Sequence, residues 1–407
     1  MKQLVRSSAV AAMLLFSSDG FAQQLDWNIT GAGARAEGFG GAFIGVADDA
    51  TAVVWNPAGL SQLERPEASV VTKFISESLD YTDNTDPSQN SSESQSHFAL
   101  NFGSFALPLK AGGNNIVVAV AYQRQLDMYG RSKTVTSSYT EDYESSGGAN
   151  TITPGVGVSL SPVISVGASA NIWLSSYDIT DKLAILGTDY TQTVNGTFSG
   201  FNFVLGGLFD FSGLKSPVPL KLGVSLKTPF NLKIDQAFKT SPAIPSYEFN
   251  DVNATLTAQM PLMLGFGGSY RIGENLTLAA DYEMRGYGSK QFTQDVNGMQ
   301  STGQMSDSKK NLNQFRVGAE YLVVTDAGVF PIRAGFQTLP TVLADYDANG
   351  NPIDQVVGNG FAVGTGFISG TFALDLTYSR NSYDQGDTYT TTSISKSMIT
   401  GSVIVYF

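Results

Sequence analysis

The stretch LTLAADYEM, residues 276–284, alternates between two sets of side chains. One set is apolar throughout, and the other contains Thr277, Ala279, Asp281 and Glu283. Because successive side chains of a strand point to opposite faces of a sheet, this period of two predicts a β-strand with one apolar face. The same pattern recurs in residues 220–227, 315–321, 332–336 and 372–378. The sequence therefore predicts an all-β protein.

The alternation divides the chain into fourteen predicted strands. Their ranges are 68–77, 96–108, 115–128, 150–160, 163–178, 196–212, 218–229, 250–271, 275–288, 312–323, 329–338, 358–368, 371–381 and 394–407. Gaps of roughly 2–6 residues alternate with gaps of roughly 12–23 residues, and boundaries of this kind err by about 2–4 residues. A soluble sandwich or propeller also alternates, but short turns at one end and long loops at the other are typical of transmembrane barrels. We therefore predict a 14-stranded antiparallel transmembrane β-barrel.

The composition is compatible with a wall that is apolar on one face only. Charged residues make up 15% of the chain, below the roughly 25% of soluble proteins, while hydrophobic residues stay at 42%. The net charge of −12 disfavours nucleic-acid binding, which depends on cationic contacts. With no cysteine and with His97 as the only histidine, thiolate and multi-histidine metal sites are excluded. We predict no cofactor and no enzymatic activity.

The N-terminus has the features of an export signal. Lys2 and Arg6 precede the apolar run 9–16, and Ala22 ends a plausible cleavage site. We therefore predict a signal peptide over residues 1–22. Later apolar runs, such as 116–121, are far shorter than the roughly 20 residues of a spanning helix. The predicted location is the bacterial outer membrane, and the apolar last strand ending at Phe407 resembles the assembly signal of such barrels.

Residues 23–66 differ from the rest, since they are rich in glycine and alanine and do not alternate. A barrel of fourteen strands is too wide for wall side chains alone to fill. We therefore predict that residues 23–66 fold into the bore as a hatch and that residues 67–407 form the barrel.

Two motifs in this segment resemble the FadL family of outer-membrane transporters. They are GAGARAEGFGGA at residues 31–42 and DDATAVVWNPAGL at residues 48–60, in which Asn56, Pro57 and Ala58 match the family's hatch motif. The resemblance implies passive uptake of long-chain fatty acids or other hydrophobic molecules. It also implies capture by external loops, binding in a lumenal pocket, and release through a lateral opening after the hatch rearranges.

The same motifs are equally similar to PorV-like barrels, relatives that act as partners or shuttles in protein secretion. A secreted protein therefore stays open as an alternative partner. The position of a wall opening is also open. The resemblance implies a lateral gap at the third strand, but the third predicted strand has no Gly or Pro over residues 116–128. Pro261 instead interrupts the eighth predicted strand and marks either a bulge or a rival opening.

Several charges fall on the polar faces of their strands and are predicted to face the lumen. They are Lys221, Lys227, Arg316 and Arg333, with Glu283, Glu320 and Asp375. One interpretation pairs them with each other or with the hatch. In the other, Arg316, Arg333 or Lys227 holds the carboxylate of a ligand. Phe238, in the apolar loop predicted at 231–250, is the candidate for first contact with a hydrophobic ligand.

Three other features carry weaker expectations. Acidic external loops, as at Asp80 and Asp83, are either a solvated surface or a contact with lipopolysaccharide through divalent cations. The run DYDANG at residues 345–350 begins like a calcium loop, but Val356 stands where a bidentate glutamate is needed, so we predict a turn. His97 is predicted to lie in the lumen or at its rim.

Overall fold

The computed structural model describes residues 31–111, 114–185, 187–243 and 251–407. The predicted signal peptide and part of the predicted apolar loop, with Ile244, Pro245 and Tyr247, lie outside the described residues. Within them, nineteen strands form one antiparallel sheet that closes on itself through the pairing of β1 with β19.

The sheet makes fourteen passes, as predicted, because β4, β9, β11, β13 and β14 extend passes begun by other strands. The strands are β1 Glu67–Asp83, β2 Ser91–Ala111, β3 Asn114–Asp127, β4 Gly130–Val135, β5 Tyr139–Ser159, β6 Ile164–Ile185, β7 Thr188–Asp210, β8 Leu220–Lys227, β9 Phe230–Ser241, β10 Asp251–Met260, β11 Met263–Ile272, β12 Leu276–Arg285, β13 Gln291–Val296, β14 Met299–Gln304, β15 Leu312–Thr325, β16 Gly328–Tyr346, β17 Pro352–Ile368, β18 Phe372–Gly386 and β19 Thr390–Tyr406.

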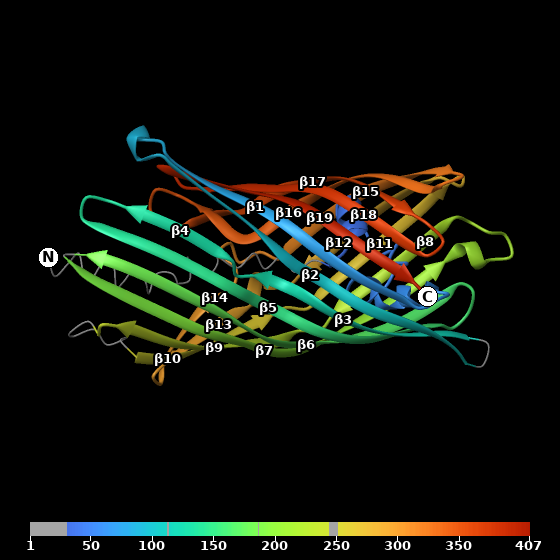
Figure 1. Cartoon of the computed structure of the whole chain (residues 1–407), viewed down its shortest axis with the longest axis horizontal. Coiled ribbons are helices and arrows are strands. Elements are labelled where there is room, and N and C mark those ends of the chain that lie inside the picture. Colours follow the sequence, from blue (N-terminus) through green and yellow to red (C-terminus); the bar gives the residue numbers. More distant parts are fainter. Residues whose placement is uncertain (1–30, 112–113, 186, 244–250) are drawn as a thin grey trace.

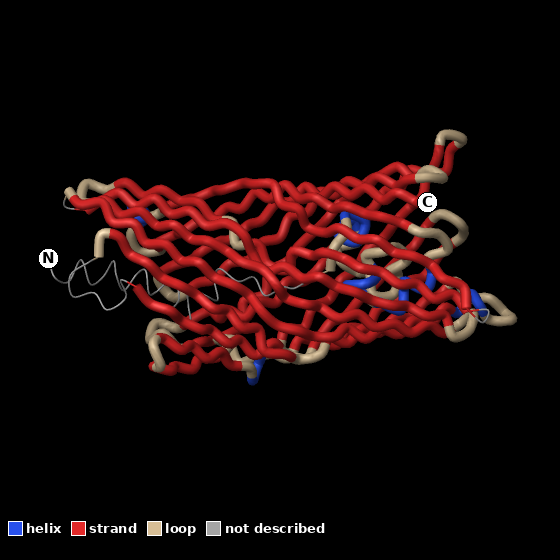
Figure 2. Tube along the Cα trace, turned by 60° about the horizontal axis from the view of Figure 1, so that its bottom comes forward, coloured by secondary structure: helices blue, strands red, loops and turns tan. Residues whose placement is uncertain are grey.

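Helices are short and gather mainly before the first strand. They are α3 Ala34–Gly38, α4 Ala52–Trp55 and the 3-10 helix η1 Pro57–Gln62, with further 3-10 turns at η2 Pro87–Gln89, η3 Phe211–Gly213 and η4 Tyr287–Ser289. None of the helices in the described ranges is both long and apolar enough to cross a bilayer. In Figures 1 and 2 the three helices that precede β1 lie inside one end of the barrel.

Both ends of the wall lie at that same end of the barrel (Figure 1). Glu67, the first residue of β1, pairs with Tyr406 of β19. The Phe407 amide donates a 3.0 Å hydrogen bond to the Pro66 carbonyl. The short turns, such as the one between β17 and β18, lie at this end too. Short turns are typical of the periplasmic side of outer-membrane barrels, so both ends of the wall are on the side expected to face the periplasm.

Most of the predicted external loops are wrong, because the strands continue through them. The loop predicted between the fifth and sixth strands, for example, is formed by the parts of β6 and β7 that lie far from the short turns. β6 continues to Ile185, and β7 begins at Thr188. The reason is that the outward face changes from apolar to polar part-way along each strand, so the alternation used to find the strands stops although the ladder does not.

β6 shows this change of polarity clearly. Val166 and Leu174 face outward near the short turns and are 40% and 66% exposed. Farther along, the exposed outward positions are Ser176 and Asp178, while Tyr177 points inward and is 1% exposed. The outer face of the first part is suited to contact with lipid. The outer face of the second part is suited to contact with water, while its inner face is apolar. The protein is therefore an outer-membrane, multi-pass barrel whose wall continues well beyond its apolar belt.

Aromatic pairs mark the upper edge of the apolar belt on several strands. Phe74 of β1 and Phe98 of β2 have ring centroids 4.9 Å apart, and Tyr282 of β12 and Phe315 of β15 are 4.8 Å apart. Aromatic side chains are enriched at both membrane–water interfaces of such barrels, where they form girdles that flank the apolar band.

Candidate functional site

The segment ahead of β1, residues 31–66, lies in the bore and is here called the inner segment. Nearly all of its apolar side chains are buried, including Phe39, Phe43 and Leu60. The wall approaches it so closely that several wall positions must be glycine. A Cβ on Gly335 would lie 2.1 Å from the Gly40 nitrogen, and one on Gly167 would lie 2.2 Å from the Pro57 carbonyl carbon.

Asn56 joins the inner segment to the wall. Its side-chain amide donates to the Ile44 carbonyl at 2.9 Å and to the Gly207 carbonyl of β7 at 3.1 Å. Its side-chain oxygen accepts the Ala58 amide at 3.2 Å, which caps the first turn of η1, where Pro57 occupies a position that needs no amide donor. Asn56, Pro57 and Ala58 are thus brought together against β6 and β7.

Replacing Asn56 with alanine is expected to destabilise the barrel by about 1–3 kcal/mol, because the buried Ile44 and Gly207 carbonyls would lose a donor. Protease cleavage within residues 31–66 should become faster, which mass spectrometry of the fragments would measure. Ser61→Ala removes only one hydrogen bond inside the segment, from Ser61 Oγ to the Ala58 carbonyl, and serves as the control. Equal cleavage of both variants would contradict this role of Asn56.

Three of the predicted lumenal charges, Arg333, Glu320 and Asp375, form a buried network. The Arg333 guanidinium is 2.7 Å from Glu320 and 2.5 Å from Asp375. Glu320 also accepts the Nε of Arg35, from the inner segment, at 3.2 Å. Burial alone lowers the pKa of Arg35, but Asp48 and Glu320 outweigh it and raise that pKa above its usual value. Arg35 therefore stays charged and links the inner segment to β15.

A second group lies beside the first. Arg316 is 3.4 Å from Glu283 and 2.6 Å from the Gln314 side-chain oxygen, and its guanidinium carbon lies 5.7 Å from the Trp55 ring centroid. Arg285 is 2.5 Å from the same Glu283.

Arg316 and Arg333 are 1% and 2% exposed. In this conformation both arginines are paired with wall carboxylates, as the pairing interpretation predicts, and Arg316 also lies over Trp55 of the inner segment. Binding of a ligand carboxylate by either one would require the inner segment to move first.

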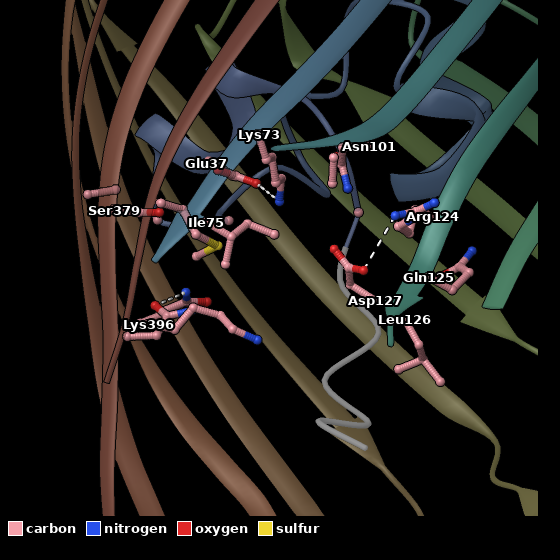
Figure 3. A pocket seen from close by; sticks show the side chains of 18 of the residues that line it. Glu37, Lys73, Ile75, Asn101, Arg124, Gln125, Leu126, Asp127, Ser379 and Lys396 are labelled. Atoms are coloured by element: carbon pink, nitrogen blue, oxygen red, sulfur yellow. Dashed lines mark hydrogen bonds and ion pairs between the residues drawn. The ribbon is translucent and has the colours of Figure 1, made fainter. Parts of the chain in front are cut away.

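An open polar cavity of about 170 Å³ lies between the inner segment and the wall (Figure 3). Charged side chains line it in pairs: Lys73 binds Glu37 of the inner segment, and Arg124 lies 3.4 Å from Asp127. Lys396 also lines the cavity and lies 3.6 Å from Glu77. The cavity therefore has cations, but each has a carboxylate partner.

An apolar cluster lines the lumen beyond the cavity, over the part of the wall that extends past the belt. Its side chains pack against one another, so a ligand would enter it by parting them. We call this packed cluster the apolar chamber. Its buried members are Leu126, Met128, Ala149, Trp173, Tyr177, Ile179, Val194, Phe198, Leu232, Ile234, Leu256, Ala258, Met260, Met263, Tyr287, Met305, Leu312 and Val342, with Tyr143, Phe230, Phe238 and Phe292 packed against them. A water-filled pore would instead have a polar lining.

The cavity and the chamber adjoin each other. Leu126 lines the polar cavity and belongs to the chamber. Gln125 lines both the polar cavity and a second, small cavity of about 20 Å³ that is also bounded by Trp173 and Lys227. Within the described residues no hydrogen bond or close ion pair holds the Lys227 ammonium, although the Glu283 carboxylate attracts it and Arg285 and Arg316 repel it. Lys227 is thus placed where a ligand in the chamber could meet it.

Phe238 lies in strand β9 and not in the loop predicted for it, because β9 runs from Phe230 to Ser241. Its partly buried ring packs against the apolar chamber. The run DYDANG at residues 345–350 forms the predicted turn. In it, Asp347 accepts the Asn349 amide at 2.9 Å and the Asn351 amide at 2.8 Å.

Pro261 lies in a break between β10 and β11, and Pro229 lies in a matching break between β8 and β9. The pairing resumes on both sides, with Phe230 opposite Met260 and Lys227 opposite Met263. The two breaks are therefore adjacent, and the wall is paired immediately above and below them.

A longer interruption separates β2 from β3. Their ladder ends with the pair Phe102 and Gln123, and the upper part of β2 then pairs only with β1 among the described residues. Side chains cross this seam: His97 Nε2 is 2.7 Å from Asp127, and the His97 ring stacks on Tyr129 at 4.0 Å. The resemblance implies a gap at this third strand, but the residues themselves give no sign of it, since residues 116–128 contain no glycine or proline.

The fold and the filled lumen define an outer-membrane β-barrel with an internal N-terminal segment. The chain belongs to the BamG family, whose profile matches residues 33–380. None of the curated proteins compared with the sequence matches it.

Solved structures of similar fold include transporters and channels for hydrocarbons. The toluene transporter TbuX of Ralstonia pickettii is 15% identical, with 94% of this chain and 100% of that chain aligned at a TM-score of 0.59. The P. putida toluene transporter TodX is 12% identical, with 93% and 99% aligned at 0.59. CymD, a monoaromatic hydrocarbon channel, is 14% identical, with 93% and 98% aligned at 0.58. At these identities the likeness concerns the fold, and it confirms the predicted FadL-type barrel.

Proposed function

We propose that the protein is an outer-membrane channel for the passive uptake of hydrophobic molecules, long-chain fatty acids among them. The observation that carries this proposal is the apolar chamber, because an apolar lining inside a wall with a polar outer face can bury an acyl chain. The names of the solved barrels of similar fold, two toluene transporters and a monoaromatic hydrocarbon channel, support the same class of ligand. No covalent step is involved.

The proposed path begins at Phe238 and continues through the chamber to the small cavity at Trp173. Lys227 there would receive a carboxylate. The inner segment would act as a hatch, with Asn56 holding it closed. For the lateral opening we favour the seam between β2 and β3 over Pro261, because side chains alone cross the seam whereas the ladder resumes on both sides of Pro261.

Fluorescence quenching tests the proposal. Palmitate brominated in its acyl chain is expected to quench Trp173 in the detergent-solubilised protein, because the indole lines the cavity. Trp173→Phe should abolish most of this quenching. Trp55→Phe, which removes the indole that lines the polar cavity, is the comparison variant and should keep most of it. Absence of quenching in the wild-type protein would contradict uptake of acyl chains.

Lys227→Met is expected to weaken binding of brominated palmitate roughly tenfold, because a hydrogen bond to a charged group contributes about 1.5–3 kcal/mol. A brominated alkane of the same length should bind both proteins alike. Titration of the Trp173 quenching gives the two affinities. Equal losses for both ligands would indicate that Lys227 acts through packing and not through its charge.

A second candidate is a PorV-like role as a partner in protein secretion. It is favoured by the tight fixation of the inner segment, since buried ion pairs and glycine contacts are suited to a plug that never moves. Native mass spectrometry separates the two: a bound acyl-chain mass supports uptake, and an empty barrel with a second polypeptide supports secretion. Lipopolysaccharide contacts at the acidic tips of the wall are compatible with both.

A further inference from the structure

The polar cavity contains hydrogen-bonding groups that the protein itself leaves unpaired. The Asn101 side-chain oxygen, the Gln125 side-chain oxygen and the Ser379 hydroxyl are buried atoms without a hydrogen-bond partner among the described residues. Asn101 and Ser379 are only 9% and 5% exposed. Figure 3 shows them entering the cavity from different parts of the wall. Buried polar groups of native proteins are nearly always satisfied, so these three point to a missing partner.

Two of the three groups are placed by β-bulges. The register of β1 with β2 passes from Phe102 directly to Leu100, which leaves Asn101 as the extra residue. The register of β3 with β5 likewise passes from Arg124 to Leu126 and leaves out Gln125. A bulge redirects a side chain at a cost to the ladder, and bulges concentrate next to functional sites. Adjacent strands thus each aim one amide at the same cavity.

The polarity of these groups restricts the ligand. The Gln125 side-chain nitrogen already donates to Gln123 at 3.0 Å and to Thr151 at 3.1 Å, so its oxygen is the atom left for the cavity. An amide oxygen needs a hydrogen-bond donor, which a hydroxyl supplies and a carboxylate lacks. The Ser379 hydroxyl bonds to either, so the restriction comes from the two amide oxygens.

Charge gives the same restriction. Lys73 and Arg124 are each bound to a carboxylate that also lines the cavity, Glu37 and Asp127, while Lys396 lies 3.6 Å from Glu77 outside the lining. An anionic head group would meet those carboxylates together with the cations, and so would gain little. An uncharged head group avoids this conflict.

From these observations we propose that the cavity binds the neutral, hydroxyl-bearing head group of an amphiphile whose chain lies in the apolar chamber. The proposal rests on the proposed function, and it names the substrate class. The cavity of about 170 Å³ suits a head group of glycerol size, since an engineered cavity of about 150 Å³ holds benzene. Leu126, which lines both spaces, marks where the head group meets the chain.

The test compares three ligands with the same chain: 1-lauroylglycerol, laurate and dodecane. Each is titrated against the full-length protein in detergent by displacement of a chain-brominated quencher of Trp173. Lauroylglycerol is expected to bind at least tenfold more tightly than either of the others. A site built to bond a hydroxyl discriminates strongly against an analogue without one, because its own polar groups are then left unpaired.

Asn101→Leu combined with Ser379→Ala should abolish this preference and leave dodecane binding unchanged. Asn101→Asp, which keeps an acceptor, should retain the preference over dodecane and bind laurate still less tightly. If the double variant fails to fold, as judged by the heat-dependent mobility of barrels in gels, Asn101→Asp and Ser379→Ala alone decide the question.

The outcomes separate the two proposals. Binding of all three ligands with similar affinity, or tighter binding of laurate, would overturn the head-group inference and leave uptake of hydrophobic molecules intact. Failure of all three ligands to bind would overturn both.

Discussion

Replacing Arg333 with methionine is expected to lower the free energy of unfolding by about 3–5 kcal/mol, the largest effect of any single substitution proposed here. The guanidinium is 2% exposed and is shared between Glu320 and Asp375. Its loss leaves Asp375 buried without a cation, while Glu320 keeps only Arg35 from the inner segment. Urea unfolding in detergent, followed by tryptophan fluorescence, measures the change.

The control is Arg65→Met, because Arg65 is exposed, lies over the Tyr406 ring and donates to the Gly370 carbonyl without pairing with a buried carboxylate. It should cost far less. Adding Asp375→Asn to Arg333→Met should recover part of the loss, since the amide removes the uncompensated charge. If Arg333→Met is no more harmful than Arg65→Met, the network does not stabilise the barrel.

Replacing Gly335 with valine is expected to displace the inner segment from the wall. The added Cβ would lie 2.1 Å from the Gly40 nitrogen and 2.3 Å from the Phe39 carbonyl carbon, and neither backbone atom can rotate away. Overpacking of this kind costs about 1–3 kcal/mol when side chains can adjust, and here the obstacle is backbone. We expect a rise in ion conductance across a planar bilayer, because the bore loses its filling.

Gly401→Val is the matched control, since the nearest atom to a Cβ there is the Thr72 hydroxyl at 4.0 Å. It should leave the conductance at the wild-type level. A closed channel in Gly335→Val, with normal folding, would show that the inner segment tolerates displacement without opening the bore.

Some of the candidate site could be predicted from local patterns. The alternation placed Arg316, Arg333 and Glu320 on the lumenal faces of their strands, because side-chain direction in a strand follows directly from position. It could not decide between pairing and ligand binding. That depends on register and on where the inner segment lies, and both arise from contacts between residues far apart in the chain.

Phe238 and the seam illustrate the opposite case. The sequence predicts Phe238 in a loop. The outward-facing side chains of β9 are polar because this strand lies beyond the apolar belt, so the alternation that identifies a strand is missing there. The seam between β2 and β3 has no sequence signal, because an interrupted ladder depends on the paths of two strands and not on the composition of either.

The sequence by itself determined the class of the fold: period-two alternation, regularly spaced short turns and a low charge content together indicate a barrel in a membrane. These are local or summed properties, and each residue contributes to them independently. Only the tertiary structure decided that the lumenal charges pair, that the wall extends past the belt around an apolar chamber, and that Asn101 and Gln125 meet at one cavity. Bulges and register bring these groups together, and a shift of one residue would send every side chain to the other face.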